Sequence, residues 1–185
     1  GSGKSTLLKM LTGLYAPTSG KILIDGTEMS QIEPRDLRRT IGYLGQDVRL
    51  FHGTLRDNLN LNMLERNDDR LFEALDFSGL GQFVKAHAKG LDLDIRDGGE
   101  GMSVGQRQSI GWARLWLQDP DICLLDEPTA GMSHSETDYM VDLIRTVTEG
   151  KTLVVVEHDM GVVFGLADRI SVLVYGEIIE TGAPE

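Results

Sequence analysis

The sequence predicts an α/β fold with a mostly parallel sheet, crossover helices and an inserted helical segment. Two continuous apolar runs, 122–125 and 152–156, are typical of strands buried on both faces. A helical pattern over 135–147 separates them, and this alternation favours parallel strands joined by a crossover helix. A polar, helix-patterned middle broken by glycines predicts a helical subdomain over about 54–117.

The remaining elements flank this core, and each is a short run that ends at a turn signal. Glycine, proline and Asp-Gly pairs supply these signals. In chain order, we expect a helix over 6–14, strands over 21–24 and 41–44, and a strand pair over 170–175 and 177–180 that turns at Gly176.

Composition excludes several classes of function. The chain has 185 residues and a formal net charge of -11, and such an acidic surface repels phosphate backbones, so we expect no nucleic-acid partner. Cys123 is the only cysteine, which excludes an intrachain disulfide and a cysteine-based zinc site. No apolar stretch approaches the ~18 residues needed to span a bilayer, so a membrane role requires a partner or a segment outside this sequence.

The chain opens with the end of a phosphate-binding loop. Loops of the form GxxxxGK[ST] wrap a polyphosphate with backbone N–H groups and a helix N-terminus. Lys4 would reach the β- and γ-phosphates, and Ser5 would hold Mg²⁺. Because the pattern starts before the first residue, we expect an N-terminally truncated P-loop NTPase core; a flexible Gly/Ser-rich tag is the alternative. The residues assigned to nucleotide binding here are Gly1, Ser2, Gly3, Lys4, Ser5 and Thr6.

Two of the predicted strands end in side chains suited to phosphate chemistry. Asp126 and Glu127 follow the run 122–125, at the strand end where open α/β sheets bind ligands. Asp126 would coordinate Mg²⁺, and Glu127 would act as the general base toward water. His158 follows the run 152–156 and would contact the γ-phosphate. A solvated acidic turn and a structural histidine are the alternatives, and the phosphate-binding loop in the same core disfavours them.

A competing motif overlaps the middle of the chain. Residues 101–105 fit GxSxG, the nucleophile elbow of α/β-hydrolases, with Ser103 as nucleophile. That elbow needs a buried strand immediately before it, whereas 91–100 is rich in charges and glycines. We therefore disfavour a hydrolase.

Taken in order and spacing, the motifs resemble the nucleotide-binding domain of ABC ATPases across nearly the whole chain. Gln46 in Tyr-Leu-Gly-Gln-Asp matches the family's glutamine loop, and 126–129 match its Walker B segment. His158 matches the switch histidine. The signature motif LSGGQ resembles Met-Ser-Val-Gly-Gln here, which assigns Ser103, Gly105 and Gln106 to the nucleotide.

The resemblance implies roles and partners beyond those read from the residues. Gln46 would join Glu127 and His158 in catalysis, and would join Ser5 and Asp126 at the metal. Two such domains would sandwich two ATP molecules head to tail, each phosphate loop facing the partner's signature motif. A transmembrane permease domain or subunit would hold the pair at the cytoplasmic face of a membrane.

Two parts of the chain resemble different transporters. Residues 41 to about 119 are similar to exporters of the type I secretion class, whereas 128–132 and 156–160 resemble ATPase subunits of branched-chain amino-acid or urea importers. A soluble ABC ATPase acting on DNA or ribosomes is the alternative class. The acidic charge and the lack of zinc cysteines argue against it.

Two departures from the family pattern bear on activity. Val104 replaces the first glycine of the signature, where a β-branched side chain crowds an approaching phosphate. Ser133 replaces an expected aspartate. We therefore expect slow hydrolysis at the site served by this signature. We also expect weak ATP binding and negligible turnover from these 185 residues alone.

Overall fold

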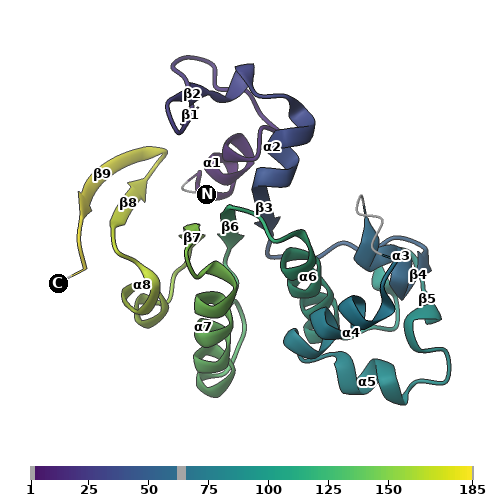
Figure 1. Ribbon diagram of the computed structural model, residues 1–185. Helices are drawn as coiled ribbons and strands as arrows, with labels where there is room; N and C mark the ends of the chain where they lie inside the picture. The colour runs from purple at the N-terminus through teal and green to yellow at the C-terminus, as the bar shows by residue number, and fades with distance from the viewer. Residues whose placement is uncertain (1–2, 62–65, 185) are drawn as a thin grey trace. The chain divides into compact units, whose positions relative to one another are not determined.

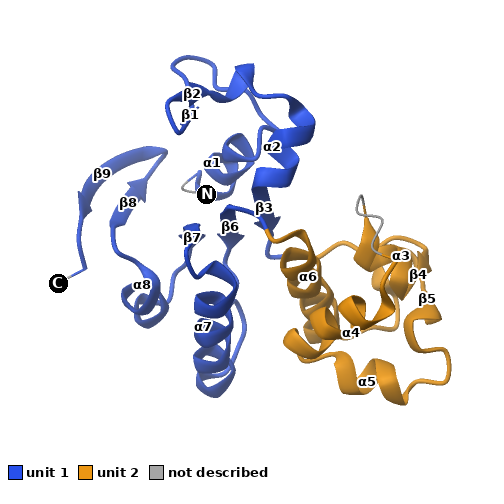
Figure 2. Ribbon diagram, viewed as in Figure 1, with its two compact units in different colours: residues 1–46, 120–185 blue, residues 47–119 orange. Residues whose placement is uncertain are grey.

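The computed structural model describes residues 3–61 and 66–184, and the chain divides into two compact units (Figure 2). The first unit consists of Gly1–Gln46 and Pro120–Glu185, and the second of Asp47–Asp119. The second unit contains the segment over 54–117 for which the sequence predicts a helical subdomain. Gly1 and Ser2, both assigned to the phosphate-binding loop, lie outside the described residues.

A three-stranded parallel sheet forms the centre of the first unit (Figure 1). Its order is β3 (Ile41–Leu44), β6 (Ile122–Asp126) and β7 (Thr152–Val156), with β6 in the middle. The middle strand is apolar because it is buried, with Cys123 and Leu125 both 0% exposed. The sequence therefore predicted both the strands and their parallel arrangement correctly, since continuous apolar runs are typical of this environment.

Helix α1 (Lys4–Leu11) packs against this sheet through a small apolar cluster. Leu8 is 0% exposed and packs with Leu37, Ile41 and Leu124. The helix begins and ends earlier than the expected helix over 6–14. Gly3 precedes it with φ of 87°, a left-handed conformation that glycine adopts without strain, and Thr12 caps its other end.

Helix α7 (His134–Thr148) forms the crossover between β6 and β7. Ser133 is its N-cap residue. The Ser133 N–H and hydroxyl both donate to the Glu136 carboxylate, at 2.8 and 2.6 Å. Short elements complete the first unit. They are β1 (Leu23–Ile24), β2 (Thr27–Glu28), η1 (Met29–Gln31), α2 (Pro34–Thr40), α8 (Met160–Leu166), β8 (Ile170–Val174) and β9 (Glu177–Gly182). Strands β8 and β9 form a hairpin that turns at Gly176, as the sequence predicts.

The second unit is mainly helical. Its core is built from leucines and other aliphatic residues that are fully buried, including Leu55, Leu71, Val84 and Ile110. The elements are β4 (Gly53–Thr54), α3 (Leu55–Asn60), α4 (Asp68–Phe77), α5 (Gly81–Ala86), η2 (Gly90–Asp92), β5 (Asp94–Ile95), η3 (Asp97–Gly99) and α6 (Val104–Gln118).

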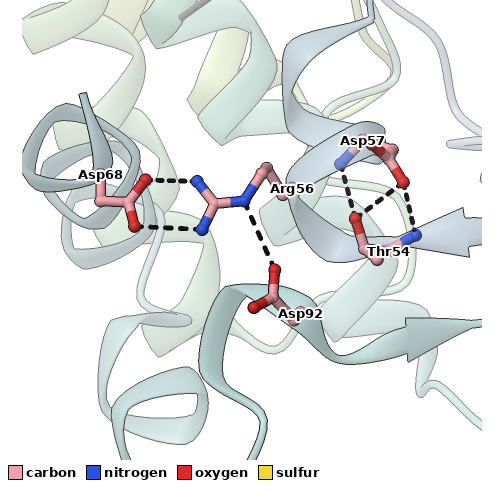
Figure 3. A network of polar contacts seen from close by, with 5 residues as sticks. All are labelled: Thr54, Arg56, Asp57, Asp68 and Asp92. Atoms are coloured by element: carbon pink, nitrogen blue, oxygen red, sulfur yellow. Dashed lines mark hydrogen bonds and ion pairs between the residues drawn. The ribbon is translucent and has the colours of Figure 1, made fainter. Parts of the chain in front are cut away.

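Polar contacts brace the start of α3 (Figure 3). Thr54 and Asp57 form a reciprocal capping box in which the Asp57 N–H donates to Thr54 Oγ1 at 3.1 Å and the Thr54 N–H donates to Asp57 at 2.9 Å. Arg56 binds Asp68 through both carboxylate oxygens and also reaches Asp92 at 3.4 Å. Hydrogen bonding to Arg56 lowers the pKa of Asp68. The network thus ties α3 to α4 and η2.

The described residues include no helix with the length and apolar character to cross a membrane.

Candidate active site

The carboxyl ends of the three parallel strands bring four of the predicted site residues to one edge of the sheet. Asp126 is the last residue of β6, and Glu127 follows it. Gln46 lies just beyond β3, and His158 just beyond β7. Because neighbouring parallel strands end at the same edge, these side chains converge although they are far apart in the sequence.

The Glu127 carboxylate is held from both sides. Gln46 Nε2 donates to Glu127 Oε2 at 3.3 Å, and His158 Nε2 lies 2.9 Å from Glu127 Oε1. An ionised carboxylate only accepts hydrogen bonds, so this contact requires a proton on His158 Nε2. The Glu127 side chain is 27% exposed and that of His158 is 67% exposed. The Glu127 carboxylate is therefore oriented and still open to water.

The backbone of Glu127 takes an uncommon conformation. Its φ is +51°, in the left-handed region that costs a residue with a side chain about 1 kcal/mol or more. The Glu127 N–H donates to the Val156 carbonyl of β7 at 2.8 Å, one residue beyond the last pair of the strand register. Pairing with the neighbouring strand thus continues past Asp126 and fixes the turn that presents Glu127.

Asp126 is buried and retains an unused acceptor. The residue is 6% exposed, and Tyr43 donates its hydroxyl to Asp126 Oδ2 at 3.4 Å. Asp126 Oδ1 is buried without a hydrogen-bond partner among the described residues. A buried acceptor without a partner in the protein is suited to a cation or to a water bound to one. Burial of Tyr43, followed by the charge of Asp126, raises the pKa of the Tyr43 phenol.

The amino end of α1 supplies the second part of the candidate site. Lys4 is its first residue and is half-buried, while Ser5 and Thr6 in the same turn are exposed. The opening N–H groups of a helix have no partners within the helix and favour an anion. Since α1 packs on β6 through Leu8 and Leu124, this helix and the strand bearing Asp126 share one core.

These groups fit Mg-ATP. A phosphate suits the helix start with its lysine, and Mg²⁺ prefers oxygen ligands such as a serine hydroxyl, a carboxylate and phosphate oxygens. No group of three or more His, Cys, Asp or Glu that could hold a metal occurs in the described part of the chain. A Mg²⁺ ion bound largely by phosphate oxygens and water needs no such group.

The signature residues belong to the second unit, where they begin helix α6. Ser103 Oγ accepts from the Gln106 N–H at 3.1 Å, and the Gln106 side chain accepts from the Ser103 N–H at 2.9 Å. This capping box starts the helix at Val104. Val104 is 67% exposed, and Gly105 is exposed beside it.

The geometry at Ser103 also bears on the hydrolase alternative. Ser103 has φ of -66° and ψ of 161°, an unstrained extended conformation, and its hydroxyl caps the helix. The segment before it is the short η3 helix, not a buried strand. A nucleophile elbow has neither feature, because it places the serine on a strained strand-to-helix turn.

Sequence reasoning missed three residues of this site: Tyr43, Thr129 and Glu157. Tyr43 contacts Asp126, and Glu157 accepts hydrogen bonds from Thr129. The available signals were weak. A tyrosine interrupts the apolar strand β3, and a carboxylate stands between the apolar strand β7 and His158.

Comparison with known proteins identifies the family of this chain. The family model described as ABC transporter matches residues 1–130. ABC transporter C family member 5 of Arabidopsis thaliana is 40% identical over 184 residues, covering 100% of this chain and 12% of that protein. The uncharacterized ABC transporter ATP-binding protein YfiC of Bacillus subtilis (strain 168) is 35% identical over 183 residues, covering 99% of this chain and 30% of that protein.

Further similarity extends to a secretion protein and to a solved structure. Leukotoxin translocation ATP-binding protein LktB of Mannheimia haemolytica is 34% identical over 182 residues, covering 98% of this chain and 26% of that protein. A bacterial Atm1-family ABC exporter with ATP bound matches with a TM-score of 0.89 and 27% identity, over 98% of this chain and 32% of the exporter chain. The predicted α/β fold is thereby confirmed. The chain belongs to the ABC transporter family.

Proposed function

We propose that this chain binds and hydrolyses Mg-ATP to power an ABC transporter. The observation that carries the proposal is the cluster at the sheet edge, where Gln46 and His158 hold the Glu127 carboxylate and Asp126 has a buried oxygen with no partner among the residues described. The chain spans between 12% and 30% of the length of the relatives described above. The activity and partners of the whole protein are therefore part of the proposal.

The residues of the site divide into those that bind phosphate, those that bind the metal and those that act on the attacking water. The loop Gly1, Ser2 and Gly3 with Lys4, Ser5 and Thr6 binds the phosphates, as the start of α1 supports. Ser5, Gln46 and Asp126 would hold Mg²⁺, and the ion would supply positive charge that neutralises the phosphate oxygens. Glu127 accepts a proton from the attacking water, and His158 orients the Glu127 carboxylate.

The partners follow from family membership and from the second unit. A second nucleotide-binding domain in head-to-tail arrangement would place Ser103, Gly105 and Gln106 at the partner's nucleotide. The exposure of the first turn of α6 supports this role, because a capped helix start offers N–H groups to an anion. A transmembrane permease would anchor the pair at the cytoplasmic face of the membrane. The transporter relatives favour this reading over a soluble ABC ATPase.

Replacing the proposed base tests the reaction. Glu127→Gln keeps the size of the side chain but removes its ability to accept a proton, so the ATP hydrolysis rate of the intact transporter should fall at least about a hundredfold. ATP should remain bound, and the two nucleotide-binding domains should stay associated. Phosphate release, retained nucleotide and domain association in the purified transporter measure the three effects.

The matched control is Glu73→Gln on α4. Glu73 is exposed and lies outside the site, and the substitution makes the same chemical change. It should hydrolyse ATP at the wild-type rate. Wild-type hydrolysis by Glu127→Gln would contradict the proposed role of Glu127, and a wild-type transporter without ATP hydrolysis would contradict the proposed function itself.

A further inference from the structure

Glu157 receives three hydrogen bonds at the end of β7. The Thr129 N–H and the Thr129 hydroxyl both donate to Glu157 Oε1, at 2.8 and 2.6 Å. The His158 N–H donates to the other oxygen, Glu157 Oε2, at 3.0 Å. Thr129 is 7% exposed and Glu157 is half-buried, so water competes little for the contact with Thr129.

These bonds join the two turns that carry Glu127 and His158. The turn after β6 is closed by the Ala130 N–H, which donates to the Glu127 carbonyl at 3.1 Å. At its start, Glu127 is anchored to Val156, and two residues later Thr129 is anchored to Glu157. The left-handed backbone of Glu127 is therefore held between two attachments to the end of one neighbouring strand.

A carboxylate is the side chain that fits this arrangement. The three groups that hydrogen-bond to Glu157 are donors, and an ionised carboxylate offers acceptors at both ends. Glutamine has the same shape but offers one acceptor and one NH₂ group, so it would face either Thr129 or the His158 N–H with donor against donor. An amide side chain therefore cannot accept hydrogen bonds from Thr129 and from the His158 N–H at the same time.

We infer that Glu157 is a positioning residue for ATP hydrolysis, which clamps the Glu127 turn to the backbone of His158 so that the base and the histidine keep their mutual geometry. The inference rests on the proposed function. The clamp lies among the residues at the strand ends and involves neither α1 nor its lysine. It therefore affects the chemical step and leaves ATP binding unchanged.

Four variants of the intact transporter test the clamp by steady-state ATP hydrolysis. Glu157→Gln should lower kcat by about tenfold to a hundredfold, because small displacements of reacting groups have effects of this size. The KM for ATP should stay within about twofold of the wild-type value, as expected for a group that acts on the chemical step. Glu157→Ala should lose at least as much kcat as Glu157→Gln.

A pair of Thr129 variants separates positioning from a general loss of folding. Thr129→Ser keeps the hydroxyl donor, whereas Thr129→Val has a similar size without the donor, so Thr129→Val should lose clearly more kcat than Thr129→Ser. Equal kcat in wild type, Glu157→Gln and Thr129→Val overturns the clamp, as does a loss confined to the KM for ATP. If the wild-type transporter shows no ATP hydrolysis, the proposed function fails first and the inference fails with it.

Discussion

At the scale of single residues, the site combines a glutamate with a strained backbone and a buried aspartate. Glu127 has φ of +51° and is held by Gln46, His158 and the Val156 carbonyl. Strained backbones of this kind persist where the surroundings over-determine them. Asp126 differs from Glu127 because it is 6% exposed and its Oδ1 has no hydrogen-bond partner within the described part of the chain. Neighbouring carboxylates thus have separate environments, which suits one to a base and the other to a metal.

Tyr43 should make the free energy of unfolding depend on pH in the alkaline range. Its pKa lies above the ordinary value of 10.0 because of burial, Asp126's charge and the hydrogen bond to Asp126. The folded state therefore keeps the phenol proton at a pH where the unfolded chain loses it. This contribution to the free energy of unfolding is complete below pH 10 and is lost as the pH rises through the folded pKa. Urea unfolding at a series of alkaline pH values measures the effect. The free energy of unfolding should fall with rising pH in wild type and should fall less in Tyr43→Phe.

The same substitution should have a small effect on catalysis. The bond from Tyr43 to Asp126 is long at 3.4 Å, so Tyr43→Phe should lower the ATP hydrolysis rate by less than about threefold. Absorbance of the phenolate during an alkaline titration provides the control, because the variant should lack the transition whose pKa lies above the ordinary tyrosine value. Identical titrations of wild type and variant would contradict the assigned environment of Tyr43.

At the scale of elements, a buried polar network holds α3 to α6 in the second unit. Asn58 is 0% exposed, and its amide donates to the carbonyls of Phe51 and Thr54, both at 3.0 Å. Arg114 of α6 donates through Nε to the Asn58 carbonyl at 2.6 Å and through Nη2 to Asn58 Oδ1 at 3.1 Å. Burial lowers the pKa of Arg114 to about 10, which still leaves the guanidinium charged at neutral pH.

Asn58→Ala should therefore destabilise the chain far more than a surface substitution does. It removes the amide that pairs with Phe51 and Thr54 and one acceptor for Arg114, so we expect the free energy of unfolding to fall by roughly 3 kcal/mol. Gln82→Ala on α5 is the control because Gln82 is exposed. Urea unfolding of both variants measures the effect. Equal unfolding midpoints for the two variants would refute the role given to Asn58.

The first turn of helix α6 contains Val104, the residue that departs from the signature motif. Val104 is its first residue and is 67% exposed, so replacing it by glycine removes no buried side chain. If the side chain crowds a phosphate, Val104→Gly should raise the ATP hydrolysis rate of the intact dimer by roughly threefold or more, equivalent to about 0.6 kcal/mol. Val104→Ala, which removes only the β-branch, should lie between. An unchanged rate in Val104→Gly would rule out the crowding hypothesis.

At the scale of the whole molecule, the sequence predicted the elements better than the contacts between them. The expected strands over 41–44 and 152–156 coincide with β3 and β7, because continuous apolar runs bounded by polar residues mark buried strands. The expected helix over 6–14 begins earlier, at Lys4, because the left-handed turn at Gly3 leads directly into α1.

Contacts between distant residues escaped prediction for a physical reason. The bond from Thr129 to Glu157 joins residues 28 apart, and the bond from Arg114 to Asn58 joins residues 56 apart. Local periodicity contains no information on such pairs. The convergence of Gln46, Glu127 and His158 was predictable only through the parallel sheet, which brings strand ends together.

The central claim is that Lys4, Asp126, Glu127 and His158 act on one Mg-ATP at the carboxyl edge of the β3–β6–β7 sheet. The most direct measurement is a structure of the intact transporter with Mg²⁺ and a non-hydrolysable ATP analogue. We predict the γ-phosphate beside Lys4, Mg²⁺ beside Ser5 and Asp126, and the Glu127 carboxylate facing the γ-phosphate. A nucleotide bound away from this edge, with Lys4 and Asp126 in separate places, would contradict the account.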